Sequence, residues 1–132
     1  MKHKYVISNK SVYNIGYHIV WCPKYRRSIL VDSVKTDMED LLIEKSADMG
    51  FSIEHMEVMP DHIHLFVKAD PSFAPHEIVK GLKGYTSNRL RKKYDHLRTK
   101  LPTLWSNSYF ISTIGFVSET VIRTYIAKQR GK

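Results

Sequence analysis

The sequence predicts an α+β fold of the ferredoxin-like (RRM-like) type, with the order βαββαβ and one further helix at the end. Four segments have the composition or alternation of strands, three have apolar residues at helical spacing, and turn-forming residues separate them. This order gives an antiparallel sheet with two helices on one face. The length of 132 residues is that of one domain, so we expect a single domain over residues 1–132.

The first part of the chain contains a strand and a helix. Residues 1–11 look like a polar lead-in. Tyr13–Cys22 is the predicted strand, because apolar and aromatic residues alternate along it and Pro23 closes it. A helix is predicted over Asp32–Met49, with its first residue as an acceptable N-cap and Gly50 as the stop.

The next two strands form a predicted hairpin. Phe51–Met59 reads as one strand and His62–Lys68 as the other, with a tight Pro60-Asp61 connection between them. In the βαββαβ topology, the first strand and His62–Lys68 lie next to each other in the middle of the sheet.

A second long helix is predicted over Pro75–Tyr94, with proline near its first position. Gly81 and Gly84 lie inside it, and each costs up to about 1 kcal/mol relative to alanine. Close packing of the helix on the sheet explains such glycines better than a backbone that approaches a phosphate.

The last part of the chain supplies one more strand and one more helix. A polar stretch over Asp95–Trp105 leads to a strand predicted at Tyr109–Gly115, and a helix follows over Val117–Arg130. On this helix, Tyr125 and Gln129 stand one turn apart between the flanks of the apolar arc.

The motif His62-Ile63-His64 is the first candidate for chemistry. On a strand, both histidines and Phe66 share one face, and the two histidines stand roughly 6.6 Å apart along the strand. Their neutral ring nitrogens can then bind one cation. The alternative is two surface histidines on a half-exposed strand, and the short motif alone leaves that alternative ahead.

The terminal helix supplies the second candidate. A carboxamide turned toward the protein body needs a partner, because burying it unpaired costs a few kcal/mol. For Gln129, a metal ion held by the histidines would be such a partner. Tyr125 is either a core anchor with its hydroxyl at the rim or a group that takes part in the chemistry.

The charge of the chain favours a polyanionic partner. Lys and Arg number 21 against 13 Asp and Glu, which gives a net charge of +8, and such an excess favours nucleic acid, although a solvated basic surface is the alternative. Eight basic residues stand between positions 80 and 100 against one acidic residue. The candidates for DNA contacts are Lys24, Arg26, Arg27, Lys83, Arg89, Arg91 and Lys92.

The remaining composition indicates a cytoplasmic protein. The single cysteine, Cys22, allows no intramolecular disulfide and fits a reducing compartment. No stretch approaches the length of a membrane span, and no apolar segment follows the basic N-terminus.

Taken together, the motifs resemble a known family. Pro60-Asp61-His62-Ile63-His64, with Tyr125 and Gln129 near the C-terminus, is similar to the single-tyrosine HUH transposases of the IS200/605 type. The likeness extends to residues 17–27 and 101–105 and covers nearly the whole chain. The segment 114–117 carries only one glycine, where this family leads us to expect a more flexible hinge.

The resemblance implies an activity and its parts. Mg²⁺ or Mn²⁺ would be held by His62, His64 and Gln129, and Tyr125 would attack single-stranded DNA beside a hairpin-bearing element end. The products would be a 5′-phosphotyrosine link and a free 3′-hydroxyl, which can rejoin for excision and insertion. A homodimer that shares its active sites between subunits is also implied.

Two other functions stay open on the sequence alone. A non-catalytic RRM-like module that binds RNA or DNA has the same element order, although the third strand lacks the Gly and aromatic run of such modules. A metal-dependent hydrolytic nuclease would use activated water and leave Tyr125 structural.

Overall fold

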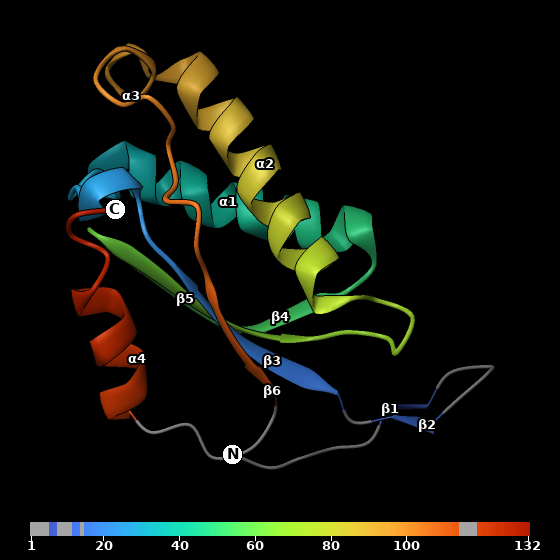
Figure 1. The fold of residues 1–132 in the computed structure, drawn as a ribbon. Coiled ribbons are helices and arrows are strands. Elements are labelled where there is room, and N and C mark those ends of the chain that lie inside the picture. Colours follow the sequence, from blue (N-terminus) through green and yellow to red (C-terminus); the bar gives the residue numbers. More distant parts are fainter. Residues whose placement is uncertain (1–5, 8–11, 14, 114–118) are drawn as a thin grey trace.

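One antiparallel sheet of four strands organises the molecule (Figure 1). The structure is a computed structural model that describes residues 6–7, 12–13, 15–113 and 119–132. Within these residues the sheet has the order β4-β5-β3-β6. Its strands are β3 (Gly16–Trp21), β4 (Ser52–Met59), β5 (His62–Lys68) and β6 (Phe110–Thr113).

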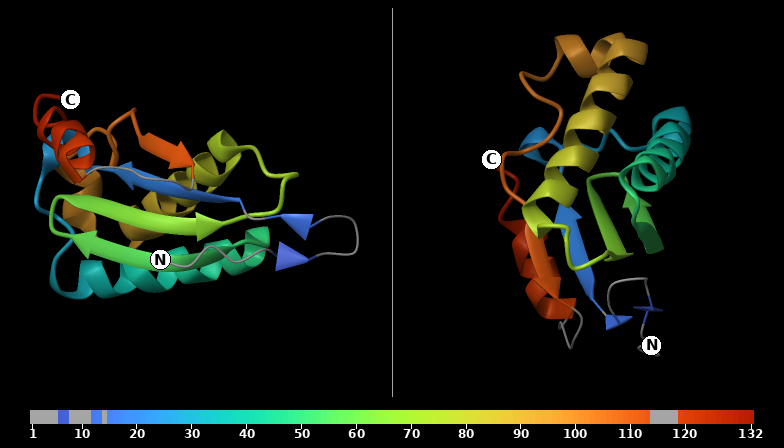
Figure 2. Two further views of the ribbon diagram at one scale, coloured as in Figure 1. Left: turned by 90° about the horizontal axis from the view of Figure 1, so that it is seen from below. Right: turned by 90° about the vertical axis from the view of Figure 1, so that its right-hand side faces the viewer.

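The helices lie on both sides of this sheet. Helices α1 (Asp32–Met49) and α2 (Pro75–Lys93) cover one face, and α4 (Glu119–Ala127) lies on the other, as Figures 1 and 2 show. The predicted α+β class, the element order and the central place of β3 and β5 are confirmed. No helix in the described ranges is both long enough and apolar enough to cross a membrane.

Short elements depart from the prediction. Val6–Ile7 (β1) pairs with Val12–Tyr13 (β2), so the lead-in expected over residues 1–11 is wrong for residues 6–7. The strand expected over Tyr13–Cys22 is likewise divided, because β2 ends at Tyr13 and β3 begins at Gly16.

Two further short elements lie in stretches that were expected to be irregular. Lys24–Arg26 form a 3₁₀ turn, η1, in which Tyr25 and Arg26 have positive φ. Asp95–Thr99 form the short helix α3 inside the predicted polar stretch.

The ends of α1 and α2 agree closely with the prediction, whereas α4 (Glu119–Ala127) ends three residues before the predicted Arg130, so Gln129 lies in the turn after the helix. Gly50 ends α1 in the left-handed conformation at φ 91°, as expected, and its N–H donates to the carbonyls of the last turn. The N-cap position of α1 falls on Val31 and not on Asp32. Residues 114–118, which include the one-glycine segment, lie outside the described residues.

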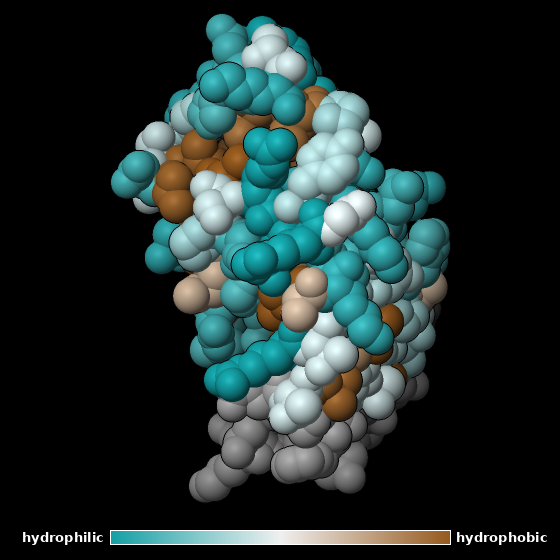
Figure 3. Space-filling view, turned by 60° about the vertical axis from the view of Figure 1, so that its left-hand side comes forward, coloured by the Kyte–Doolittle hydropathy of each residue, from teal (hydrophilic) through white to brown (hydrophobic). Residues whose placement is uncertain are grey.

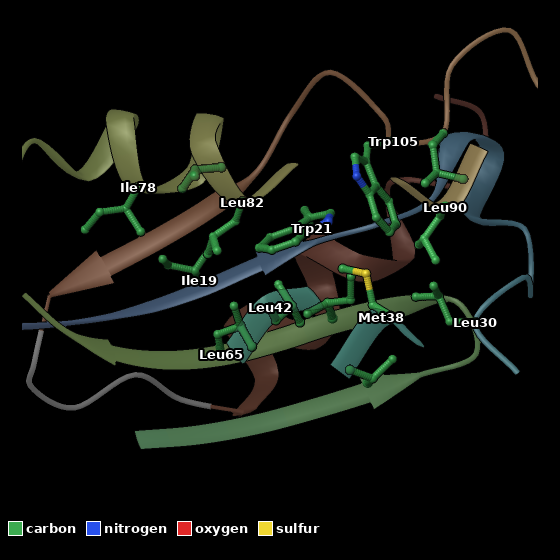
Figure 4. Close-up of a cluster of buried hydrophobic side chains, with 14 of the residues drawn as sticks. Ile19, Trp21, Leu30, Met38, Leu42, Leu65, Ile78, Leu82, Leu90 and Trp105 are labelled. Carbon is green, nitrogen blue, oxygen red and sulfur yellow. The ribbon is translucent and has the colours of Figure 1, made fainter. Parts of the chain in front are cut away.

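The two faces of the sheet have opposite character. Ile63, Leu65 and Val67 of β5 are fully buried, as are Ile19 and Trp21 of β3. Figure 4 shows Ile19, Trp21 and Leu65 among the buried side chains of α1 and α2. Burying side chains of this size stabilises the fold by about 1.5–3 kcal/mol each. The alternate residues of the same strands therefore face α4.

The two glycines of α2 have different surroundings. A Cβ on Gly81 would lie 2.6 Å from the Met49 Sδ atom, whereas a Cβ on Gly84 would meet nothing within 4 Å. Gly81 is therefore closely packed, but against α1 and not against the sheet, and the expected packing of the helix on the sheet explains neither glycine.

We expect Gly84→Ala to raise the free energy of unfolding by about 0.5–1 kcal/mol, because alanine loses less backbone entropy in a helix. Gly81→Ala should gain less, since Met49 must move. Urea denaturation measures the free energy of unfolding of both variants. In a Met49→Ala background, the difference between the two gains should become smaller. An equal gain at both positions would contradict this account.

Candidate active site

A pocket of about 600 Å³ lies between the polar face of the sheet and α4. The sheet contributes His18, Glu57, His62 and His64, and Arg26 of η1 lies beside them. Residues 122, 123, 126 and 127 of α4 form the opposite wall. Both predicted histidine ligands therefore line one pocket.

His62 is held by a carboxylate. Its Nδ1 lies 2.9 Å from Asp61 Oδ1, and Asp61 Oδ2 forms a salt bridge with Arg26 Nε at 3.1 Å. A carboxylate can only accept, so the Nδ1 of His62 carries the proton. The Nε2 of the neutral ring is then the nitrogen available to a cation.

His64 is held by another histidine, which the sequence analysis missed. His18 Nδ1 lies 3.3 Å from His64 Nε2, and His18 also packs on Phe66, with ring centroids 5.0 Å apart. Burial lowers the pKa of both His18 and His64, which favours their neutral forms. The alternation of the first strand put His18 on its less apolar face, but only the strand register places it beside His64.

Glu57 borders the same histidine pair from the edge strand. It stands opposite His64 in the register of β4 with β5, and its carboxylate contacts His55 Nε2 at 2.9 Å. That hydrogen bond lowers the pKa of Glu57. Among the described residues, no group of three His, Cys, Asp or Glu side chains is arranged to hold a metal ion.

Tyr125 and Gln129 lie together, but neither lines the histidine pocket. Ser108 Oγ donates to Gln129 Oε1 at 2.8 Å and lies 3.0 Å from the Tyr125 hydroxyl. Because a serine hydroxyl has one proton, Tyr125 is the donor in the second contact. Burial raises the pKa of Tyr125, and the hydrogen bond with Ser108 opposes that shift.

The expected burial of Gln129 is confirmed, since only 4% of it is exposed. Within the chain its side chain has two hydrogen-bond partners. The amide oxygen accepts from Ser108, and the amide nitrogen donates to the carbonyl of Tyr125 at 3.3 Å. The structure thus brings His62 and His64 to one pocket and holds Tyr125 with Gln129 at Ser108.

Three of the predicted DNA contacts have partners within the chain. Arg26 pairs with Asp61 and donates to the Ile126 carbonyl at 3.4 Å. Lys83 donates to the carbonyls of Ser106 at 2.7 Å and Ser108 at 3.3 Å, and burial lowers its pKa to about 8. The guanidinium of Arg91 donates to three backbone carbonyls in the segment 98–102.

The other four predicted contacts lie at the surface or over exposed rings. Lys24 and Arg27 lie over the ring of Tyr25, at 5.2 and 5.9 Å from its centroid, and Tyr25 is 41% exposed. Arg89 is exposed, with its guanidinium 5.0 Å from the centroid of the Tyr85 ring, and Lys92 is exposed.

The family of the chain follows from a direct comparison of sequences. A family model described as "Transposase IS200 like" matches residues 11–129. The chain belongs to this family. The Tyr125 helix and the histidine strand both fall inside the matched range.

Relatives from two organisms support the family. The chain is 40% identical to the ISDra2 transposase TnpA of Deinococcus radiodurans over 123 residues, which cover 92% of this chain and 88% of that protein. It is 28% identical to the IS200 transposase of Salmonella typhimurium over 119 residues, which cover 89% and 78% of the two chains.

Solved structures of transposases have the same fold. A crystal structure of a transposase from Deinococcus radiodurans superposes with a TM-score of 0.87 at 32% identity, covering 96% of this chain and 99% of that one. A REP-associated tyrosine transposase bound to a REP hairpin has a TM-score of 0.59 at 14% identity, covering 98% and 68% of the two chains. At that identity, the second match concerns the fold alone.

We expect Lys83→Met to lower the free energy of unfolding by about 1–3 kcal/mol, because it leaves the carbonyl of buried Ser106 without its donor. Lys92→Met, at an exposed position of the same helix, should stay within about 0.5 kcal/mol of wild type. Urea denaturation compares the two variants. Equal stability of both would show that the Lys83 contacts contribute nothing.

Proposed function

We propose that the protein is a transposase that cuts and rejoins single-stranded DNA through a tyrosine nucleophile. Tyr125 is the nucleophile, and His62, His64 and Gln129 hold Mg²⁺ or Mn²⁺. The observation that carries this proposal is the arrangement of two histidines in one pocket beneath α4, the helix that bears Tyr125 and is followed by Gln129. Membership of the IS200-like family supports it independently.

The donor set is chemically suited to a divalent cation. Asp61 leaves the Nε2 of His62 free, and burial favours the neutral form of His64. Gln129 would supply an uncharged amide oxygen, the atom that now accepts a hydrogen bond from Ser108. When bound, the cation keeps its full double charge among these ligands and polarises the scissile phosphate as a Lewis acid.

Tyr125 carries out the bond exchange. Its phenol, with an ordinary pKa near 10, must lose its proton to attack. That proton passes to the solvent, because the neutral Ser108 hydroxyl that lies 3.0 Å from the phenol oxygen is too weak a base to keep it. The phenolate oxygen forms a bond to phosphorus, and the bond from phosphorus to the 3′-oxygen breaks. The 3′-oxygen takes up a proton, and the DNA 5′-phosphate stays on Tyr125. Attack by a 3′-hydroxyl on the phosphotyrosine reverses these changes and rejoins a strand.

The DNA partner we propose is a single strand with an imperfect hairpin near the element end. One structural neighbour is a tyrosine transposase bound to a REP hairpin, which supports a ligand of this class. The side of the molecule that carries α4 is largely hydrophilic, with separate hydrophobic patches (Figure 3). Of the predicted contacts, those without carbonyl or carboxylate partners are the best placed for phosphates: Lys24, Arg27, Arg89 and Lys92.

We further propose a homodimer in which Tyr125 of one subunit serves the histidine pocket of the other. What supports it is that Tyr125 and Gln129 of this chain are held at Ser108 and do not line its own pocket. The reaction is expected in the cytoplasm, where the DNA lies and Cys22 stays reduced.

Tyr125→Phe should abolish a covalent protein–DNA adduct, because phenylalanine has no oxygen to attack phosphorus. The assay incubates single strands from both flanks of the gene with protein and Mn²⁺ and resolves the products by denaturing electrophoresis. Tyr94→Phe, which removes a hydroxyl far from the pocket, should still form the adduct. Cut DNA with no adduct from the wild type would indicate a hydrolytic nuclease instead.

Mixing Tyr125→Phe with His62→Ala should restore the adduct if the site is shared between subunits. Half of randomly paired dimers are mixed and hold one complete site each, so about a quarter of the wild-type sites return. A size tag on the His62→Ala chain should shift the adduct, because that chain supplies Tyr125. No adduct from the mixture, when each wild-type control is active, would place nucleophile and histidines in one subunit.

A further inference from the structure

We propose that Arg26 is a positioning residue of the site, because it ties the Asp61–His62 pair to the C-terminal turn of α4. The assignment rests on the proposed function and gives that site one more residue. It replaces the direct DNA contact that the sequence predicted for Arg26.

The guanidinium of Arg26 contacts both halves of the site at once. Its Nε forms a salt bridge with Asp61 Oδ2 at 3.1 Å, and its Nη1 donates to the carbonyl of Ile126 at 3.4 Å. The other carboxylate oxygen of Asp61 lies 2.9 Å from His62 Nδ1. A planar guanidinium has donors on different edges, so it fixes two partners relative to each other.

The surroundings of Arg26 favour this role over a direct DNA contact. Its side chain is 14% exposed, and a guanidinium removed from water is costly unless it is paired. A phosphate that took this guanidinium would leave the Asp61 carboxylate without its cation. Lys24 and Arg27, in contrast, lie over the exposed ring of Tyr25 and have no carboxylate partner among the described contacts.

Arg26 acts where α4 ends. The helix runs to Ala127, and the Ile126 carbonyl also accepts from the Gln129 N–H at 3.1 Å. A cation beside the last carbonyls of a helix is favoured by the helix dipole. The same carbonyl therefore links Arg26 to the turn that carries Gln129, and Tyr125 is the preceding residue in the chain.

The backbone of η1 supplies a second link to the same turn. The Tyr25 N–H donates to the carbonyl of Lys132 at 3.4 Å. Tyr25 and Arg26 have φ of 58° and 52°, a left-handed conformation that is uncommon for residues other than glycine and is retained where surrounding contacts fix it. Ile126 lines the histidine pocket and Tyr125 does not, so a helix held at Ile126 directs Tyr125 away from its own pocket.

The test measures the rate of adduct formation in a single turnover, with the strand from the flank of the gene that gives the adduct. At saturating DNA, Arg26→Gln and Arg26→Lys should each be at least about tenfold slower than wild type, because a small misplacement of reacting groups costs this much. Lysine keeps the charge but replaces two nitrogens that face different partners with one. Lys35→Gln is the matched control, since it removes one positive charge at an exposed position of α1 and should keep the wild-type rate. Wild-type rates in both Arg26 variants would overturn the assignment.

The affinity for DNA separates positioning from DNA contact. Fluorescence anisotropy of the labelled strand should give Arg26→Gln the affinity of Lys35→Gln within about threefold, since each variant loses one charge. If Arg26→Gln binds DNA more weakly than this and regains the wild-type rate at saturating DNA, Arg26 is a phosphate contact and the assignment is wrong.

Hydrogen exchange tests the tie without any activity. In protein without DNA, the amides of residues 126–132 should exchange at least about fivefold faster in Arg26→Gln than in wild type, with exchange in α1 and α2 unchanged. Unchanged exchange over residues 126–132 would overturn the assignment whether or not DNA is cleaved. If this exchange rises but the wild type forms no adduct with any strand, the tie between η1 and α4 is supported and the proposed function alone fails.

Discussion

The pairing of β3 with β5 at the centre of the sheet determines where every other functional part lies. Each strand buries one set of alternate side chains beneath α1 and α2, with Ile63 and Leu65 fully enclosed, and turns the other set toward α4. A slip of one residue would exchange the faces, placing the histidines in the core and the aliphatic residues outside. Because the core resists that exchange, the polar row of His18, His62 and His64 is fixed by the same contacts that fold the domain.

The segment between α3 and β6 connects this core to α4, the helix that carries Tyr125. Lys83 and Trp105 tie it to α2, since Lys83 donates to the carbonyls of Ser106 and Ser108 and the Trp105 indole donates to the Lys83 carbonyl at 3.1 Å. A partly buried ammonium is costly unless hydrogen bonds compensate for lost water. These contacts therefore hold the backbone of Ser108, whose hydroxyl in turn holds Tyr125 and Gln129. The position of the proposed nucleophile depends on a lysine in a different layer.

Long periodic elements, the neighbouring places of β3 and β5 and the local motif were predictable from the sequence, and side-chain contacts between distant segments were not. The C-terminal end of α1 and the start of β5 agree with the prediction, because Gly50 and the Pro60-Asp61 turn mark them chemically. The β1–β2 hairpin and α3 are too short for periodicity to indicate. The part played by His18 depends on the strand register, and the choice of Ser108 as the partner of Gln129 depends on how α4 packs. Neither is encoded in residue spacing.

The net charge of +8 overstates the positive charge that is available to DNA, because some basic side chains have partners within the chain. The positions of the other basic side chains constrain the path that a DNA molecule could take. Arg26 and Lys83 are bound within the chain, whereas Lys24 and Arg27 flank the turn beside the histidine pocket. Arg89 lies on α2, in the helical layer on the opposite face of the sheet (Figure 1). A phosphate at the pocket therefore cannot also contact Arg89, so these surfaces would bind different parts of any DNA molecule that contacts both. Under the proposed function, the cleaved strand and the hairpin are such parts, because cleavage occurs beside the hairpin and not within it.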